Sequence, residues 1–238
     1  MSIFSVQCLL ECLAGSPSVT FVKILKALRL DQATGPDGIS AYFLRSLAQY
    51  LDKPIAMIIR RIFQESVWPH RWQIHHISPL FKKGSVYQPN QYRGIHLTCI
   101  LSKVVERVIA NPLVSFLEAH GYGDNQWAFR KKASARDLVT VCMATWVLQI
   151  CRGCKIGLYL SDISGAFDKV SRSLLIGKLS RIGLPDTFLD FLNAYLLSRE
   201  GYVRVENALS DVLMLSNMVF QGTVLGPSLW NVIFQGCL

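Results

Sequence analysis

The sequence has few acidic residues, no long hydrophobic run and no convincing signal peptide. Only 16 Asp and Glu accompany 25 Lys and Arg among 238 residues, so the net charge is +9. No apolar run reaches the ~18 residues of a membrane-spanning helix. The apolar stretch 3–13 lacks a basic n-region and is interrupted by Gln7 and Glu11. These absences favour an intracellular protein, in the cytoplasm or the nucleus, with no membrane partner.

The cysteines give no indication of a disulfide framework. The seven cysteines are odd in number and irregularly spaced, which argues against a secreted, disulfide-stapled fold. Cys151 and Cys154 have the spacing of a redox or zinc-ligand motif, but no second pair accompanies them. A structural zinc site needs four ligands, so this tetrapeptide alone does not define one. The role of these two cysteines stays open.

The composition is that of a folded protein with an uneven charge distribution. A hydrophobic content of 51% excludes wholesale disorder, and the length suits one large domain or two lobes. Residues 60–136 contain 12 Lys and Arg against 4 Asp and Glu, whereas residues 151–238 contain 8 against 7. The basic part suits contact with nucleic acid or nucleotides, although an ordinary surface with few acidic residues would look similar.

Hydrophobic periodicity and capping residues define the expected elements. They predict helices at 19–30, 41–50, 54–66, 101–110, 138–150, 173–182 and 188–197, and a last helix that begins at Gly226. Residues 74–81 and a hairpin of 202–206 and 212–215 are expected as strands. The helix at 101–110 should point Lys103, Glu106 and Arg107 outward, and the helix at 138–150 should be mostly buried.

Residues 156–162 are expected to form a further strand that ends in a carboxylate. Alternation places the apolar residues of this run and Asp162 on one face. Two-metal phosphoryl transfer needs several carboxylates around two cations, and Asp162 is a candidate first ligand. The backbone carbonyl of Ile163 could supply another oxygen. Taken alone, Asp162 and Asp168 fit a turn and a helix cap better than a metal site.

Six short motifs that follow one another along the chain are more specific. They are Gly35–Ile39, Pro79–Gly84, Tyr92–Ile95, Gln126–Arg130, Asp162–Asp168 and Gln221–Pro227. Together, over roughly residues 20–234, they resemble the reverse transcriptase domain of non-long-terminal-repeat (LINE-type) retrotransposons. Group II intron reverse transcriptases are the nearest rival, and the Lys-Lys-Gly and Tyr-Arg-x-Ile sequences within these motifs lean toward retrotransposons.

The resemblance implies a right-hand polymerase of the α+β class, helix-rich with a small antiparallel sheet. It implies an N-terminal extension and fingers at 19–150 and an incomplete palm at 151–238, without a thumb; residues 1–18 are an unassigned leader. The expected partners are an RNA template, a DNA primer and deoxynucleoside triphosphates, and the expected cofactor is Mg²⁺, with two ions in the complete family site.

Roles carry over from the family to matching positions. Asp162, with the Ile163 carbonyl, resembles the metal-binding aspartate, and Phe167 resembles the aromatic gate that excludes a ribose 2′-hydroxyl. Asp168 resembles a capping or orienting residue. The remaining matches contact the incoming nucleotide (Lys82, Arg93, Gln221, Gly222) or the template (Gln126 and Arg130, with Lys131 and Lys132 extending the basic run).

Four departures qualify this reading. Gly94 and Phe220 stand where the family has proline, and Ala128 stands where it has glycine. The sequence ends at Leu238, before the family's Ala-Asp-Asp box, which supplies further metal carboxylates. We therefore expect that the isolated chain does not polymerise. The alternatives are a non-catalytic nucleic-acid-binding remnant and an unstable fragment without independent function.

Overall fold

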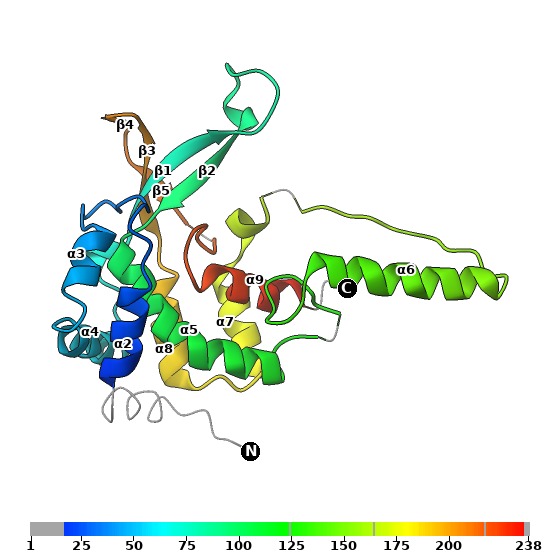
Figure 1. Cartoon of the computed structure of the whole chain (residues 1–238), viewed down its shortest axis with the longest axis horizontal. Helices are drawn as coiled ribbons and strands as arrows, with labels where there is room; N and C mark the ends of the chain where they lie inside the picture. The colour runs from blue at the N-terminus through cyan, green and yellow to red at the C-terminus, as the bar shows by residue number, and fades with distance from the viewer. Residues whose placement is uncertain (1–16, 124, 164, 217, 236–238) are drawn as a thin grey trace.

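The computed structural model describes residues 17–123, 125–163, 165–216 and 218–235, so the expected leader lies almost entirely outside it. A body of helices carries a small sheet that projects on one side (Figure 1). The helices are α2 (Pro17–Lys26), α3 (Ala41–Ser46), α4 (Asp52–Glu65), α5 (Ile100–His120), α6 (Ala135–Cys151), α7 (Arg172–Arg181), α8 (Asp186–Tyr195) and α9 (Gly226–Phe234). The strands are β1 (Ile74–Phe81), β2 (Tyr92–Leu97), β3 (Arg199–Val205), β4 (Ala208–Leu209) and β5 (Leu213–Leu215), and short 3-10 turns occur at His70–Trp72, Pro89–Gln91 and Ala166–Lys169 (η3).

Local capping signals set several helix ends. The Ser40 hydroxyl accepts the N–H of Phe43 at 3.2 Å and starts α3, as the sequence predicts. Ser66 adopts a left-handed conformation and ends α4. Ser134 and Ser171 cap α6 and α7 in the same way as Ser40. Each predicted helix is present, although α3 ends earlier and α5 continues further than expected.

The sheet is mixed, and the prediction of an antiparallel sheet is wrong. Its strand order is β2-β1-β3-β4, with β5 also paired to β3. β1 pairs antiparallel with β2, but β1 and β3 run parallel, with Ile74 opposite Glu200. The helices α5 to α8 connect β2 to β3, and this long connection lets β3 enter the sheet parallel to β1. β1 lies before residue 150 and β3 lies after it, yet the two strands share one sheet. The predicted division into fingers at 19–150 and palm at 151–238 therefore stays a prediction.

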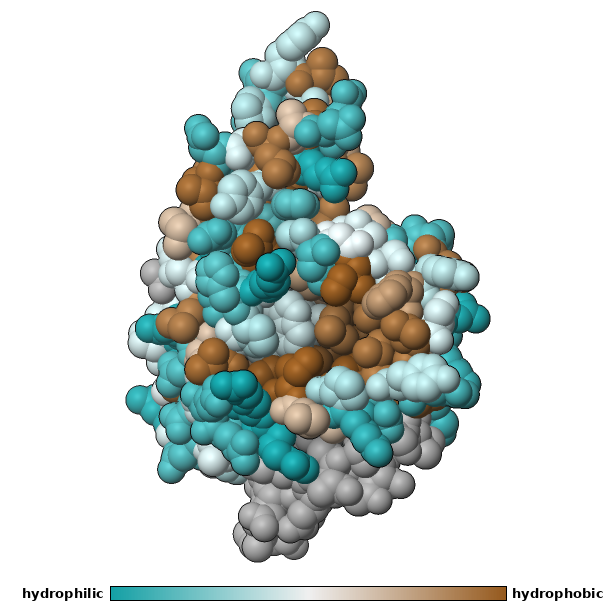
Figure 2. Space-filling model, turned by 90° about the vertical axis from the view of Figure 1, so that its left-hand side faces the viewer, coloured by the Kyte–Doolittle hydropathy of each residue, from teal (hydrophilic) through white to brown (hydrophobic). Residues whose placement is uncertain are grey.

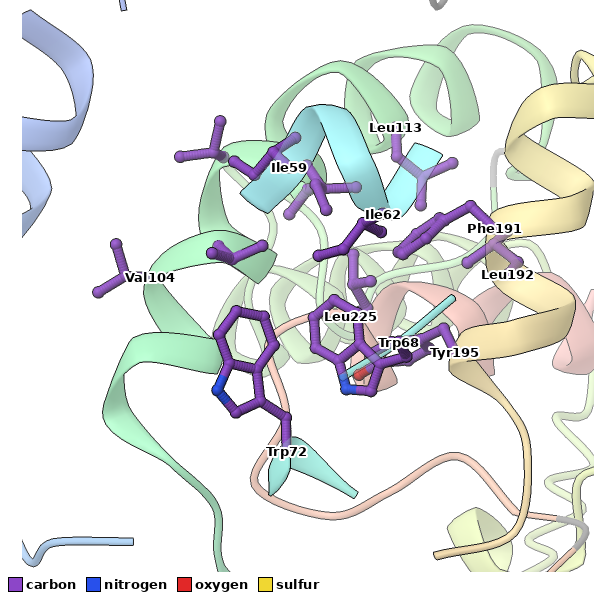
Figure 3. Packing of buried hydrophobic residues seen from close by; sticks show 14 of the residues in the cluster. Ile59, Ile62, Trp68, Trp72, Val104, Leu113, Phe191, Leu192, Tyr195 and Leu225 are labelled. Carbon is purple, nitrogen blue, oxygen red and sulfur yellow. The ribbon is translucent and has the colours of Figure 1, made fainter. Parts of the chain in front are cut away.

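The core is built around aromatic side chains (Figure 3). Trp68 packs edge-on against Trp72 and Tyr195, with ring centroids 5.1 and 5.0 Å away, and also against Phe191. Such edge-to-face contacts add to the gain from burying the rings. Leu225, just before α9, belongs to the same buried cluster. The start of α9 is therefore packed against the centre of the molecule.

Residues 156–162 do not form the predicted strand. They are exposed, extended coil, and in Figure 1 residues 154–163 run back toward the helical body from the end of α6. Among the described strands, none pairs with this segment. An extended segment without a neighbouring strand leaves its backbone groups to solvent, so period-two alternation alone does not produce a strand.

Two expectations about helix burial are also wrong. None of the side chains of α6 is buried, and several of its apolar residues are about half exposed. Glu106 does not point outward but is fully buried on α5, among Val104, Val105 and Ile109. The start of α9 covers this part of α5, a contact between residues distant in sequence.

The surface mixes apolar and polar side chains. Figure 2 shows hydrophobic residues gathered across the middle of the face that carries the N-terminal helices. Exposed apolar residues on these elements include Tyr42, Phe43 and Met57. Among the helices of the described residues, none is long and apolar enough to cross a membrane.

Candidate functional site

Three of the six motifs meet around Phe167. The carbonyl oxygen of Phe167 accepts the backbone N–H of Val219 at 2.9 Å, which ties the Phe167 segment to the chain just before Gln221. The Phe167 ring stacks on Trp230 of α9, with centroids 5.9 Å apart and planes 28° apart. It also meets the edge of Phe129, at 6.1 Å. The structure thus brings together segments that lie about 40 to 100 residues apart in the sequence.

The loop at 220–225 has a conformation that requires glycine. Gly222 has a φ of +76°, and a Cβ there would lie 2.6 Å from the carbonyl oxygen of His96 on β2. Both the left-handed backbone and the close approach exclude other residues. Thr223 folds the loop back on itself, because its hydroxyl donates to the Phe220 carbonyl at 2.6 Å. Gln221 is half-buried and Gly222 is exposed, so both remain accessible.

The motif at Gln126–Arg130 is attached to α9 by a residue that sequence reasoning missed. Buried Asn231 accepts the Gln126 side-chain amide at 2.8 Å and donates to the Ala128 carbonyl at 2.8 Å. Arg130 donates to the carbonyl oxygens of Gly123 and Gln126 at 3.0 and 3.3 Å. These bonds hold the loop in place, and template contact by Gln126 and Arg130 stays a prediction. The missed signal was an asparagine inside an apolar helix, since buried polar groups are normally hydrogen-bonded.

The predicted phosphate-contacting side chains are exposed on the projecting hairpin. Arg93 on β2 lies opposite Leu80 on β1. Just beyond the two strands, the backbone N–H of Lys82 donates a hydrogen bond to the Gln91 carbonyl at 2.8 Å. Lys131 and Lys132 are exposed beside the Gln126–Arg130 loop. Among the described residues, the ion pairs are Arg29–Asp31 and Arg61–Glu65, so no carboxylate neutralises these four cations. They are available to an anionic ligand.

The predicted metal ligands stand apart from other donors. Asp162 and Ile163 are exposed in the coil that follows α6. Asp168 lies in η3 and is also exposed, while Ser171 supplies the cap of α7. No group of three or more His, Cys, Asp or Glu side chains in the described part of the chain could hold a metal ion. The metal-binding role of Asp162 and Ile163 and the capping or orienting role of Asp168 stay predictions.

A family model described as "Reverse transcriptase (RNA-dependent DNA polymerase)" matches residues 80–238, which is more than half of the chain. The chain belongs to the reverse transcriptase family. The predicted resemblance is thereby confirmed.

Several relatives of this reverse transcriptase domain are proteins of retrotransposons. It is 31% identical, over 89% of its length, to a probable RNA-directed DNA polymerase from transposon BS of Drosophila melanogaster. It is 32% identical, over 84% of its length, to a probable RNA-directed DNA polymerase from transposon X-element of the same species. Identity to the RNA-directed DNA polymerase from mobile element jockey is 26%, over 88% of the chain. The chain spans only 22–23% of the length of these relatives.

The reverse transcriptase domain accommodates its departures from the family pattern in different ways. A Cβ at Gly94 would lie 2.9 Å from Cγ2 of Ile77, so this part of the hairpin packs against glycine. The left-handed conformation near Ala128 falls on Phe129 instead, with a φ of +54°. Phe220 is buried, and the guanidinium of Arg199 lies 3.8 Å from the centre of its ring.

The reverse transcriptase domain also contains a buried polar cluster that sequence analysis missed. Arg199 Nη1 lies 2.9 Å from His75 Nε2, and His75 Nδ1 lies 3.1 Å from His96 Nδ1. Arg199 Nη2 donates to the Tyr195 carbonyl at 3.0 Å. Burial, together with the nearby charge of Arg199, lowers the pKa of His75 to about 2. Glu106 completes the cluster, and its position between apolar residues of α5 was the available signal.

Proposed function

We propose that this reverse transcriptase domain forms the deoxynucleotide-binding and template-binding surface of a retrotransposon RNA-directed DNA polymerase. In this proposal the projecting hairpin belongs to the fingers, and the segment from residue 151 onward belongs to the palm. The observation that carries the proposal is the hydrogen bond from Val219 to Phe167, which fixes the proposed sugar gate beside Gln221 and Gly222.

The arrangement suits a triphosphate that approaches between the loop and the hairpin base. Gly222 lies against β2, the strand that also carries Arg93. Arg93 and Lys82 would contact phosphate oxygens, where a fixed cation offsets negative charge. Gln221 and Gly222 would lie against the base and sugar. The rigid ring of Phe167, held by Trp230 and Phe129, would exclude a 2′-hydroxyl.

The donor set does not fit two Mg²⁺ ions. Asp162 offers one carboxylate and Ile163 one carbonyl, whereas a two-ion site needs several carboxylates around both cations. We therefore assign no catalytic step to the described residues, and the proposed function is binding of substrate and template. We propose Asp162 as the metal-binding aspartate of the family, which would bind Mg²⁺ together with further carboxylates of the polymerase.

Template-directed nucleotide binding tests the proposal. The chain is titrated with dCTP in the presence of Mg²⁺ and a primer–template whose next template base is guanine or adenine. We expect saturable binding with guanine and at least about tenfold weaker binding with adenine, since each wrong pair loses its hydrogen bonds. Arg93→Gln should weaken dCTP binding, and Arg60→Gln, at an exposed position of α4, should not. Binding that ignores the template base would contradict the proposal.

Nucleic-acid binding by the basic loop has its own test. Replacing Lys131 and Lys132 with Gln should reduce the slope of log affinity against log salt by about 1.4–1.8, because each phosphate contact contributes about 0.7–0.9. Lys26 and Lys53, exposed on α2 and α4, provide the matched control. Equal slopes for the two double variants would exclude Lys131 and Lys132 from the template-binding surface.

A further inference from the structure

The loop at 220–225 is held at its C-terminal end by a carboxylate from a distant helix. Glu106 Oε2 accepts the backbone N–H of Val224 at 2.6 Å and that of Leu225 at 3.4 Å. Leu225 is the N-cap of α9 and has no side-chain cap of its own. In its ionised form, Glu106 also compensates the partial positive charge of the helix N-terminus. One fully buried side chain thus fixes both the loop end and the start of α9.

The N-terminal end of the same loop is held by Arg199. The guanidinium stacks 3.8 Å from the ring centre of Phe220, the residue directly before Gln221. His75 also meets the edge of the Phe220 ring, at 5.4 Å. Arg199 is itself fixed by His75 and by the Tyr195 carbonyl. The family has a proline at this position, whose ring restricts the backbone. Here the contacts of the Phe220 side chain hold the residue in place instead.

The residues that hold the two ends of the loop, Glu106 and Arg199, interact electrostatically. The pKa of Glu106 is raised on balance, because burial outweighs the charge of Arg199 and the N–H groups of Val224 and Leu225, which lower it. Arg199 thus favours the ionised form of the carboxylate that binds the loop. Burying two charged groups is unfavourable compared with apolar packing, so stability alone does not explain them. They do impose one geometry on a loop that lacks regular secondary structure.

We propose that Glu106 and Arg199 are positioning residues that clamp the two ends of the loop at 220–225 and so set Gln221 and Gly222 for the incoming nucleotide. The inference rests on the proposed nucleotide contacts of Gln221 and Gly222. Between the two clamped ends, Gly222 rests on the His96 carbonyl, so the loop is supported at three points. Neither Glu106 nor Arg199 touches the nucleotide itself.

The test compares Glu106→Gln with Glu118→Gln, which alters another carboxylate of α5. Residue-resolved amide exchange is measured at Val224 and Leu225, with Val104 as an internal reference in the core. Affinities for dCTP and for primer–template are measured on the same samples. For Glu106→Gln we expect about tenfold faster exchange at the two loop amides and about tenfold weaker dCTP binding, because a charge-assisted bond is lost. Primer–template affinity and exchange at Val104 should stay unchanged, as should all values for Glu118→Gln.

Each other outcome of this experiment contradicts the clamp, the positioning role or the proposed function. Loop amides that stay protected in Glu106→Gln contradict the clamp, whatever the chain binds. Exposed amides with unchanged dCTP affinity, or an equal loss of dCTP and primer–template affinity, contradict the positioning role. A wild-type chain that binds no dCTP overturns the proposed function and the role that rests on it, while the exchange data still test the clamp. If Glu106→Gln does not fold, Phe220→Leu removes the stack on Arg199 at the other end of the loop, and a loss of dCTP affinity without a loss of primer–template affinity then tests the positioning role.

Discussion

The backbone N–H of Val219 donates a hydrogen bond to the carbonyl oxygen of Phe167 at 2.9 Å, although 52 positions separate the two residues (219 − 167). This bond joins the Asp162–Asp168 motif to the Gln221–Pro227 motif. It explains how two short sequences of the reverse transcriptase family come to share one site.

Asn231 should be a strong determinant of local stability. Replacing it with Ala removes its two side-chain hydrogen bonds, to the Gln126 amide and to the Ala128 carbonyl, from a buried position on α9. We expect a loss of about 2 kcal/mol in the free energy of unfolding, at about 1 kcal/mol for each buried hydrogen bond. Urea unfolding measures this, with Asn193→Ala on the exposed side of α8 as control. A loss no larger than that of the control would show that Asn231 does not anchor the loop.

Acid should destabilise the fold through its buried histidines. Burial lowers the pKa of both His75 and His96 below the ordinary value of 6.5, with Arg199 lowering both further and Asp168 partly opposing the shift in His96. The unfolded chain therefore binds more protons below pH 6.5, and stability is lost as pH falls from 6.5 toward the folded pKa values. Each such histidine contributes up to about 1.4 kcal/mol per pH unit.

The acid effect is checked by urea unfolding between pH 7 and pH 5. His75→Gln should reduce the slope of unfolding free energy against pH by up to about 1 kcal/mol per unit, because one buried titrating group is gone. His70→Gln, at an exposed position, should leave the slope unchanged. The prediction fails if His75→Gln and the wild type share one slope.

Helix α6 should tolerate polar substitution on its exposed apolar side. Val139, Val147 and Leu148 are 60%, 54% and 59% exposed, so replacing all three with Gln removes no buried contact. We expect less self-association in sedimentation and a change in unfolding free energy within about 0.5 kcal/mol per substitution. Val108→Gln, a buried position on α5, should unfold the chain. A triple variant that unfolds like Val108→Gln would contradict the exposure of α6.

Local signals were sufficient for much of the fold. The strand at 74–81 was predicted with its observed bounds, because the strand and the turn that ends it are neighbours in the sequence. Ser40 was predicted as a cap for the same reason. The ordered motifs were sufficient for the family, since their sequences can be compared without knowing their contacts.

What failed depended on partners distant in the sequence. Residues 156–162 alternate like a strand, but pairing requires a neighbour that no local pattern reveals. Glu106 has the charge of a surface residue, and only its contact with Val224 shows why it is buried. Asn231 and Arg199 belong to the same group, because their partners lie about 100 residues or more away. The site residues themselves remain predictions where only the motifs support them.

The deoxynucleotide preference of Phe167→Val tests the central claim most directly. Affinities for dCTP and CTP are measured on the chain with Mg²⁺ and a primer–template whose next base is guanine. If the Phe167 ring excludes the 2′-hydroxyl, the wild type should prefer dCTP, and Phe167→Val should lower that preference by about tenfold or more while keeping dCTP affinity within about threefold. An unchanged preference for dCTP in a folded Phe167→Val chain would contradict the proposed nucleotide site.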